Sequence, residues 1–159
     1  MGQVTVKRHE FGDYHVLVKN LRLADQREIL AGTGMSIEDA LAFAVNTSHK
    51  CWIGWEDNKP IAIFGCSDSS NDNETSANVW LLGTDRIKDV RWQFLRKSKE
   101  WMSHVSKDYE MLWAVSDSRN KVHQKWYEWL GFDIVQTVLV GPFSLPFYHI
   151  MYTKDKTNV

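Results

Sequence analysis

The chain has 159 residues, a formal net charge of −1 and 43% hydrophobic residues. This length predicts one domain over residues 1–159, with a core large enough to fold without a metal or a disulfide. The near-neutral charge argues against a strongly basic nucleic-acid-binding protein, and no apolar run approaches the length of a membrane span. Eight Trp residues indicate a dense core with aromatic-lined pockets or interfaces.

Hydrophobic periodicity and capping residues predict mixed secondary structure. In chain order we expect a strand at residues 4–6, helices at 14–21, 24–31 and 36–46, a hairpin of strands at 51–55 and 61–66, a strand at 78–83, a helix at 87–105, a strand at 111–115, a helix at 120–132 and a hairpin of strands at 134–140 and 147–153. Polar segments occupy residues 7–13, 67–76 and 154–159. The order predicts an α+β domain with helices on both faces of the sheet.

The two cysteines, Cys51 and Cys66, have no neighbouring Cys or His at the spacing of a zinc site. We therefore expect no metal centre. The first residues, Met-Gly-Gln, carry no apolar signal segment, which favours the cytoplasm. In that reducing compartment two buried thiols are expected rather than a disulfide.

The helix expected at residues 120–132 has both ends marked, by Ser118 or Asn120 as a cap and by Gly131 as a left-handed stop. At about 100° per residue, four residues share the face that we interpret as core: Val122, Trp126, Trp129 and Leu130. Three polar residues lie along the flank of this core face: Asn120, His123 and Tyr127. Packing alone does not require this polar flank, so it indicates a functional site. For His123 the alternative is a structural histidine bonded to a nearby backbone group.

Two further groups of charges have open interpretations. Arg22, Asp25 and Glu28 stand three residues apart on one helix face, either as an exposed charge ladder or as a functional or structural polar cluster. The second group is basic: Arg86, Lys88, Arg91, Arg96, Lys97 and Lys99. Because these side chains would point in several directions on a helix, a solvated face is favoured over a nucleic-acid-binding strip.

The element order and the helix at residues 120–132 resemble the GNAT (Gcn5-related N-acetyltransferase) superfamily. That family has an Asn-x-x-small-x-x-apolar-Tyr-x-x-x-Gly-Phe helix, and the matching residues here are Asn120, His123 at the usually small position, Trp126, Tyr127, Gly131 and Phe132. The resemblance implies a central mixed, mostly antiparallel sheet of about six or seven strands. It also implies acetyl-CoA as cofactor and an amine of a protein or small molecule as acceptor.

The resemblance assigns roles to individual residues. It implies that Asn120 contacts the pantetheine arm, with His123 beside it, and that Tyr127 protonates the departing thiolate. Backbone N–H groups of the splayed central strand would hold the carbonyl oxygen. In this sequence they belong to Leu81, Leu82 and Gly83. Three acids are candidates for the general base by position, each alternatively a solvated loop acid: Glu74, Glu56 and Asp68.

The expected pyrophosphate loop departs from the family pattern. Family members use glycines there, because glycine lets backbone N–H groups approach phosphate at the start of a helix. Residues 84–92, the equivalent stretch, contain no glycine and two acids. The residues expected to hold phosphates by charge instead are Arg86, Lys88 and Arg91.

A second resemblance joins several motifs over residues 21–147. These motifs are Asn20-Leu-Arg22-x-x-Asp25-x-x-Glu28, Pro60-Ile-Ala-Ile-Phe-Gly65, Trp80-Leu-Leu-Gly-Thr-Asp85 and Asn120-x-x-His123-x-x-Trp126-x-x-x-Leu130-Gly-Phe132. Together they resemble small GNAT-like or internal virion and assembly proteins of short-tailed, T7-like phages. That resemblance implies a location in the host cytoplasm or the virion. Two functions remain open: an N-acyltransferase, and a non-catalytic scaffold that binds a phage or host protein. A homo-oligomer is open as well.

Overall fold

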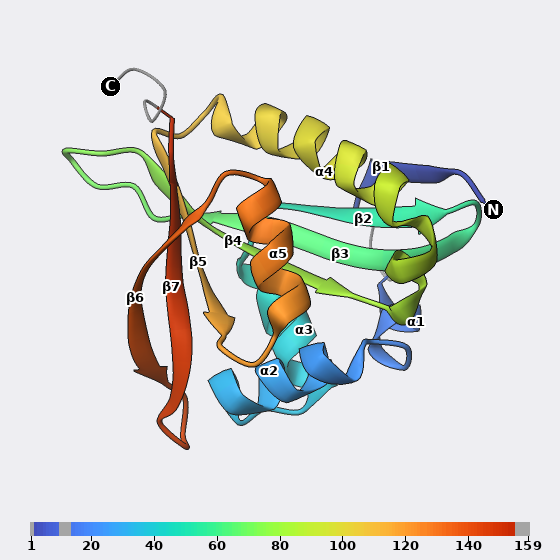
Figure 1. Cartoon of the computed structure of the whole chain (residues 1–159), viewed down its shortest axis with the longest axis horizontal. Coiled ribbons are helices and arrows are strands. Elements are labelled where there is room, and N and C mark those ends of the chain that lie inside the picture. Colours follow the sequence, from blue (N-terminus) through green and yellow to red (C-terminus); the bar gives the residue numbers. More distant parts are fainter. Residues whose placement is uncertain (1, 10–13, 155–159) are drawn as a thin grey trace.

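A computed structural model, which describes residues 2–9 and 14–154, folds the chain around one seven-stranded sheet in the order β1-β2-β3-β4-β5-β7-β6 (Figure 1). The strands are β1 (Val4–Arg8), β2 (Lys50–Glu56), β3 (Lys59–Asp68), β4 (Ser76–Gly83), β5 (Met111–Asp117), β6 (Asp133–Val140) and β7 (Leu145–Thr153). β4 and β5 run parallel, and the other neighbours are antiparallel. The predicted mixed, mostly antiparallel sheet is confirmed.

Helices cover both faces of this sheet (Figure 1). They are α1 (His15–Val18), α2 (Leu23–Thr33), α3 (Ile37–Thr47), the 3₁₀ helix η1 (Asp85–Val90), α4 (Arg91–Ser106) and α5 (Lys121–Trp129). Successive strand residues point to opposite faces, so Leu81 packs with α4 and α5 whereas Leu82 packs with α1 and α3. Within the described residues, no helix is both long and apolar enough to cross a bilayer.

β4 and β5 separate soon after they pair. Their ladder contains only Ser76–Asn78 against Met111–Trp113. Beyond it the strands diverge, β4 toward Gly83 and β5 toward Asp117, and the opening faces α5 (Figure 1). Backbone N–H and C=O groups on the facing strand edges therefore need partners other than the neighbouring strand.

Local sequence signals set several element ends. The hydroxyl of Ser36 accepts the N–H of Asp39 at the start of α3, as the capping pattern predicts. Gly131 adopts a φ of 95° after α5, the left-handed stop expected there. The helix expected from residue 87 begins instead as η1, and α4 starts at Arg91. Parts of the predicted polar connector and tail, residues 10–13 and 155–159, lie outside the described residues.

The predicted core face of α5 is wrong for two of its four residues. Val122 and Trp129 are 53% and 41% exposed, whereas Trp126 and Leu130 are buried as expected. The polar flank is buried instead, including His123. The reason is that α2, 90 or more residues earlier in the chain, lies against this flank and supplies polar partners for it.

Candidate functional site

A cleft of about 720 Å³ lies between the end of β4, η1, α4 and the outer face of α5. Leu81, Phe94 and Trp126 give it apolar walls. Exposed cationic side chains also line it: Lys88, Arg91 and Lys125. A mostly apolar cleft of this size, with a few charged groups, has the dimensions of a small-molecule site.

The backbone of β4 contributes unequally to this cleft. The backbone N–H of Thr84 donates to the carbonyl of Ile61 in β3. Because backbone groups alternate in direction along an antiparallel ladder, the N–H and C=O of Leu82 also point toward β3. The backbone N–H and C=O groups of Leu81 and Gly83 point the other way, toward the opening between β4 and β5. Gly83 is already engaged, because its N–H donates to Asp25 Oδ2 at 2.8 Å and its carbonyl accepts the N–H of Arg22. Of the three predicted positions, Leu81 thus faces the cleft beyond the end of the β4–β5 ladder.

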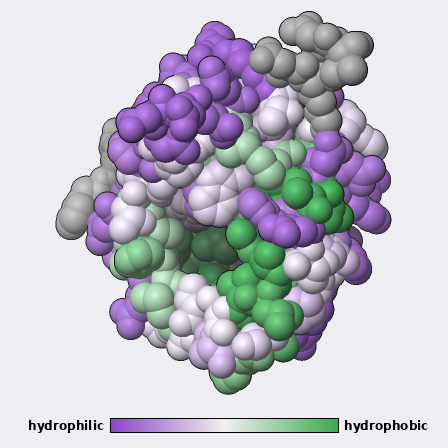
Figure 2. Space-filling model, turned by 90° about the vertical axis from the view of Figure 1, so that its left-hand side faces the viewer, coloured by the Kyte–Doolittle hydropathy of each residue, from purple (hydrophilic) through white to green (hydrophobic). Residues whose placement is uncertain are grey.

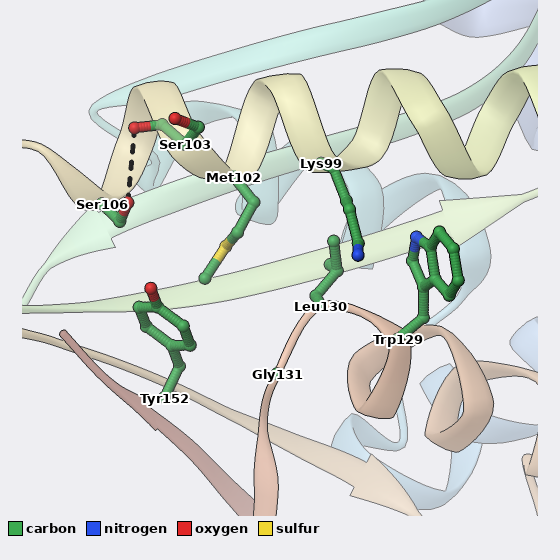
Figure 3. Close-up of a pocket in the computed structure, with 8 residues that line it drawn as sticks. All are labelled: Lys99, Met102, Ser103, Ser106, Trp129, Leu130, Gly131 and Tyr152. Atoms are coloured by element: carbon green, nitrogen blue, oxygen red, sulfur yellow. Dashed lines mark hydrogen bonds between the residues drawn. The ribbon is translucent and has the colours of Figure 1, made fainter. Parts of the chain in front are cut away.

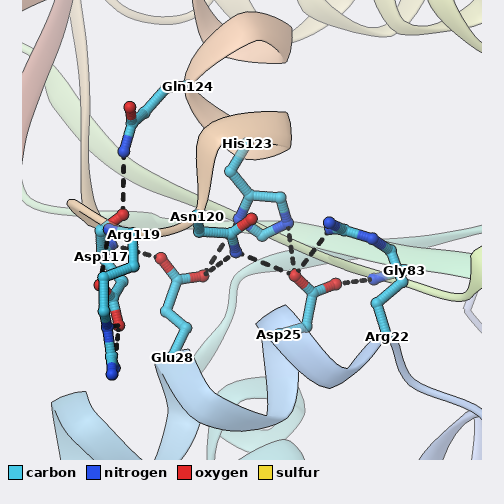
Figure 4. A network of polar contacts seen from close by, with 9 residues as sticks. All are labelled: Arg22, Asp25, Glu28, Gly83, Asp117, Arg119, Asn120, His123 and Gln124. Atoms are coloured by element: carbon cyan, nitrogen blue, oxygen red, sulfur yellow. Dashed lines mark hydrogen bonds and ion pairs between the residues drawn. The ribbon is translucent and has the colours of Figure 1, made fainter.

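A buried charge network forms the polar end of the cleft (Figure 4). Asp25 is fully buried. Its Oδ1 lies 3.0 Å from each of three nitrogens: Arg22 Nη1, Asn120 Nδ2 and His123 Nε2. Glu28 Oε2 lies 3.0 Å from His123 Nδ1 and 3.2 Å from Asn120 Nδ2. Arg22, Asp25 and Glu28 therefore lie in a polar cluster with Asn120 and His123 and do not form an exposed charge ladder.

The two acids of α2 also reach the ends of both splayed strands. Asp25 accepts the N–H of Gly83 at the end of β4, and Glu28 accepts the N–H of Asp117 at the end of β5. His123 and Asn120, at the start of α5, lie between these two acids (Figure 4). The network therefore joins β4, β5, α2 and α5 at the open end of the splay.

His123 is charged in this environment. Burial opposes protonation, but the negative charges of Asp25 and Glu28 outweigh it and raise the pKa of His123 to about 10. Burial likewise opposes ionisation of Asp25, yet contacts with His123 and Arg22 hold its pKa below the usual value. His123 Nε2 makes no aligned hydrogen bond, so its contact with Asp25 is chiefly electrostatic.

Asp25, Glu28 and His123 also offer ligand atoms within 4.8 Å of one another, a geometry that could hold a metal ion. A metal-binding histidine must be neutral. Here both ring nitrogens lie at ion-pair distance from carboxylates. The group is therefore an ion-pair network around an imidazolium.

Tyr127, the expected proton donor, is 3% exposed and does not line the cleft. Its ring packs against Trp126 and Phe132, with centroids 4.8 and 5.2 Å away. Burial and the nearby negative charges of Glu28 and Asp25 raise the pKa of Tyr127 well above its usual value. The hydroxyl therefore holds its proton more tightly than a tyrosine in water.

Only some of the remaining residues that were predicted for the site lie at the cleft. Glu74 lies in the turn before β4, at the opposite end of that strand from Gly83. Arg86 is turned away from the cleft, because it pairs with Glu56 and Asp89. Asp68 accepts the N–H of Ser70 at the end of β3. None of these acids lines the cleft, whereas Lys88 and Arg91 do.

Sequence reasoning missed Lys125 and Trp129 as cleft residues. The available signal is that both residues lie beside Val122 on the helix surface, where the sequence analysis assigns Val122 and Trp129 to the core. Trp129 also borders a second cavity of about 340 Å³ between the ends of α4 and α5 (Figure 3). There the ammonium group of Lys99 lies 4.1 Å from the centre of the Trp129 ring, a cation–π contact that orients the indole between the two cavities.

Comparison with solved structures identifies the architecture. An aminoglycoside N(6')acetyltransferase from Legionella pneumophila superposes with a TM-score of 0.71 at 16% identity, over 96% of this chain and 93% of that chain. The chain has the fold of the GNAT acetyltransferases.

Two other structures with the GNAT fold contain a coenzyme. The protein yncA from Salmonella typhimurium, solved with its cofactor acetyl-CoA, has a TM-score of 0.72 at 11% identity, over 96% of this chain and 95% of that chain. Spermidine N-acetyltransferase from Vibrio cholerae, in complex with CoA and spermine, has a TM-score of 0.69 at 13% identity, over 99% of each chain. By sequence, no protein-family model and no curated protein matches the chain.

Proposed function

We propose that the chain is an acyl-CoA-dependent N-acyltransferase, which transfers an acetyl group from acetyl-CoA to an amine of a protein or small molecule. The observation that carries the proposal is the cleft of about 720 Å³ beside the unpaired edge of β4. Two structures with the same fold, from Salmonella typhimurium and Vibrio cholerae, hold acetyl-CoA or CoA. They support a coenzyme as the ligand of this cleft.

The residues of the cleft fit such a ligand. The backbone of Leu81 offers a donor and an acceptor to the amide groups of a pantetheine arm, and the apolar walls suit its methylene groups. Lys88, Arg91 and Lys125 supply the positive charge that phosphates require. These three cations take the place of the glycine-rich turn that residues 84–92 lack.

When bound, acetyl-CoA supplies the acetyl group as a thioester. The chain's part is to take a proton from the attacking amine and to stabilise or protonate the departing sulfur. His123 is one of the charged residues of the cleft wall, whereas Tyr127 is buried and does not line the cleft. We therefore assign stabilisation of the sulfur to His123 and keep Tyr127 as the competing proton donor. The proposal does not use Glu74, because its turn lies at the other end of β4.

Calorimetric titration with acetyl-CoA tests the coenzyme step. Saturation at about a hundred times the dissociation constant adds roughly 2.7 kcal/mol to the stability of the folded protein. Replacing both Lys88 and Arg91 by Glu should weaken binding at least ~10-fold, since a charge-assisted contact contributes about 1.5–3 kcal/mol. The matched control, Arg96→Glu with Lys97→Glu, makes the same change in net charge at two positions of α4 that do not line the cleft. It should leave binding unchanged. Absence of any binding at millimolar acetyl-CoA would refute the proposal.

Thiol release from acetyl-CoA, with a polyamine and a lysine peptide as trial acceptors, tests the chemistry. His123→Gln should lower kcat more than it raises KM, and Tyr127→Phe should leave kcat nearly unchanged. The opposite ranking would return the proton-donor role to Tyr127. Circular dichroism of both variants establishes that each is folded before the rates are compared.

A second candidate function is a non-catalytic interaction scaffold, as in the virion or assembly proteins of T7-like phages. The observation in its favour is that Asp25 already occupies the N–H of Gly83, one of the groups expected to hold a carbonyl oxygen. Under this alternative the protein would bind no acetyl-CoA and would co-purify from infected cells with a defined phage or host protein.

A further inference from the structure

The segment that brings two cations to the cleft is attached to β2 by an ion pair. Lys88 and Arg91 line the cleft, but Arg86, two residues before Lys88, does not. The guanidinium group of Arg86 faces Glu56 of β2 and donates from Nε and Nη2 to the two carboxylate oxygens, the second at 2.8 Å. A bidentate pair of this kind fixes orientation as well as distance. The pair therefore holds η1 against β2 just before the cations of the cleft.

Glu56 is the buried partner in this arrangement. It is 5% exposed and also accepts the N–H of Gly2 at 3.2 Å. The hydrogen bonds from Arg86 hold the pKa of the Glu56 carboxyl below its usual value, so the group is ionised. The other acid that Arg86 contacts, Asp89, is 60% exposed, and exposed pairs contribute little. Glu56 is therefore the partner that fixes Arg86.

The start of α4 is attached to the same edge of the sheet. The side chain of Gln93 accepts the N–H of Val4 in β1 at 2.9 Å, and Val90 packs in a small core with Val4 and Ile61. In Figure 1 the start of β1, the turn between β2 and β3, and the start of α4 lie together at the right-hand side. The two cationic residues of the cleft thus lie between two attached residues, Arg86 before them and Gln93 after them.

We propose that Glu56 is a positioning residue for coenzyme binding, which acts through Arg86 to hold η1 so that Lys88 and Arg91 face the phosphates of acetyl-CoA. The inference rests on the proposed function. Residues 84–92 contain no glycine, so phosphates there depend on side chains, and a preorganised backbone lowers the cost of ordering those side chains. Glu56, a candidate general base by its position in the sequence, thereby acts on binding and not on proton transfer.

Calorimetric titration of Glu56→Gln with acetyl-CoA tests the proposal by the sign of the change in affinity. Loss of a negative charge near a phosphate site should by itself strengthen binding. Loss of a positioning contact should instead weaken it, by roughly 2- to 30-fold for a substitution that acts through another residue. Arg86→Gln should also weaken binding. The double variant should bind no more weakly than Arg86→Gln alone, because either change breaks the same pair.

Two controls each remove one negative charge elsewhere. Glu100→Gln changes an exposed residue of α4 that pairs with Lys97, and Asp72→Asn changes an exposed residue in the loop between β3 and β4. That loop lies on the left-hand side of Figure 1, and Figure 2, which faces that side, shows hydrophilic surface toward its top. Neither control should weaken binding.

A background without the two cations separates positioning from a general loss of structure. In a variant with Lys88→Gln and Arg91→Gln, the further change Glu56→Gln should leave the remaining affinity unchanged, because the groups that Glu56 positions are absent. A purely structural role would lower the affinity by the same factor in both backgrounds. Urea unfolding followed by circular dichroism establishes that each variant is folded.

The outcomes distinguish this inference from the proposed function. Binding by Glu56→Gln that equals or exceeds that of the unmodified chain overturns the inference and leaves the acyltransferase proposal in place. A lowered kcat with unchanged affinity also overturns it and returns Glu56 to the role of general base. Absence of acetyl-CoA binding by the unmodified chain refutes both.

Discussion

Asp25 is a residue whose single carboxylate contacts donors from the end of β4 and from the start of α5. It accepts from Gly83 at the end of β4 and from Asn120 before α5, and it faces the charged ring of His123. Removing it would leave the buried N–H of Gly83 without its partner and would leave His123 with Glu28 as its one carboxylate among the described residues. A carboxylate with these contacts is a structural requirement of the site, whatever reaction the site performs.

Asp25→Ala is expected to lower the free energy of unfolding by about 3–5 kcal/mol, the cost of breaking a buried charge pair. Urea unfolding followed by circular dichroism measures it. The matched control is Glu100→Ala, which removes an exposed i,i+3 partner of Lys97 and should change stability by about 0–1 kcal/mol. Equal effects of the two substitutions would contradict the assigned contribution of the network.

The raised pKa of His123 predicts a dependence of stability on alkaline pH. A histidine whose pKa is higher in the folded than in the unfolded state stabilises fully below its unfolded value, about 6.5, and this contribution is lost as pH rises to about 10. The urea midpoint should therefore fall between these pH values. His123→Gln should flatten this part of the profile, and His104→Gln, at an exposed position on α4, should preserve the slope.

The sequence could predict that Arg22, Asp25 and Glu28 share a face, because three-residue spacing on a helix is a local property. It could not predict burial of that face. The partners of Asp25 and Glu28 on α5 are more than 90 residues away in the chain, and their contact depends on how α2 packs. The same distance explains why Asn120 and His123 could be identified as a polar flank but not as part of a charge network.

At the scale of elements, the turn between β6 and β7 fixes how the last hairpin meets α2. Gly141 has a φ of 78°, and a Cβ there would lie 2.0 Å from the carbonyl oxygen of Ala31. Neither the backbone conformation nor the space admits a side chain. The hairpin and the end of α2 therefore approach one another backbone to backbone.

Gly141→Ala is expected to destabilise the protein by more than about 1 kcal/mol, because it adds the strain of a positive φ to a clash with backbone. Thermal unfolding by calorimetry measures this. Ser144 lies in the same turn with a φ of 50°, and Ser144→Gly relieves strain there, so it should be neutral or stabilising. A stabilising Gly141→Ala would show that the turn adopts another conformation in solution.

Element prediction succeeded where periodicity and capping decide, as at the start of α3 and the left-handed end of α5. It failed on the orientation of α5. A helix with apolar residues on one side and polar residues on the other usually buries the apolar side. Here the polar side finds partners on α2, so Val122 and Trp129 are left to line the cleft.

For the whole molecule, the sheet couples the two larger hydrophobic cores of the described residues, one under α4 and α5 and the other under α1, α2 and α3. Substitutions at two adjacent residues of β4 test the two cores separately, because Leu81 belongs to the first core and Leu82 to the second. Leu81→Ala and Leu82→Ala should each lower the free energy of unfolding by about 2–5 kcal/mol. For each variant, tryptophan fluorescence and far-UV circular dichroism should give a single shared transition.

Only Leu81→Ala should also change the affinity for acetyl-CoA, since only Leu81 of this pair lines the cleft. Two separate unfolding transitions would contradict the coupling of the cores through the sheet. An equal loss of affinity in both variants would instead point to a general loosening of the fold.

The GNAT fold could be predicted from the order of elements and a few motifs, because both are properties of the chain read in sequence. The resemblance also implied the splayed strand beside the cleft, but the wall formed by Val122, Lys125 and Trp129 could not be predicted, because it depends on how α5 packs against α2.

The separation of β4 from β5 divides the sheet into two parts, strands β1 to β4 and strands β5 to β7, which pair with each other at one end of β4 and β5. Three residue pairs join β4 and β5 at the closed end. At the open end, one carboxylate of α2 accepts a hydrogen bond from β4 and a second accepts one from β5. Beyond the ladder the two strands are therefore held by hydrogen bonds from backbone N–H groups to carboxylates of α2, and not by a continuous backbone ladder. Loss of either carboxylate would remove the contact of α2 with one of the two strands and would leave the β4–β5 ladder of Ser76–Asn78 and Met111–Trp113 in place.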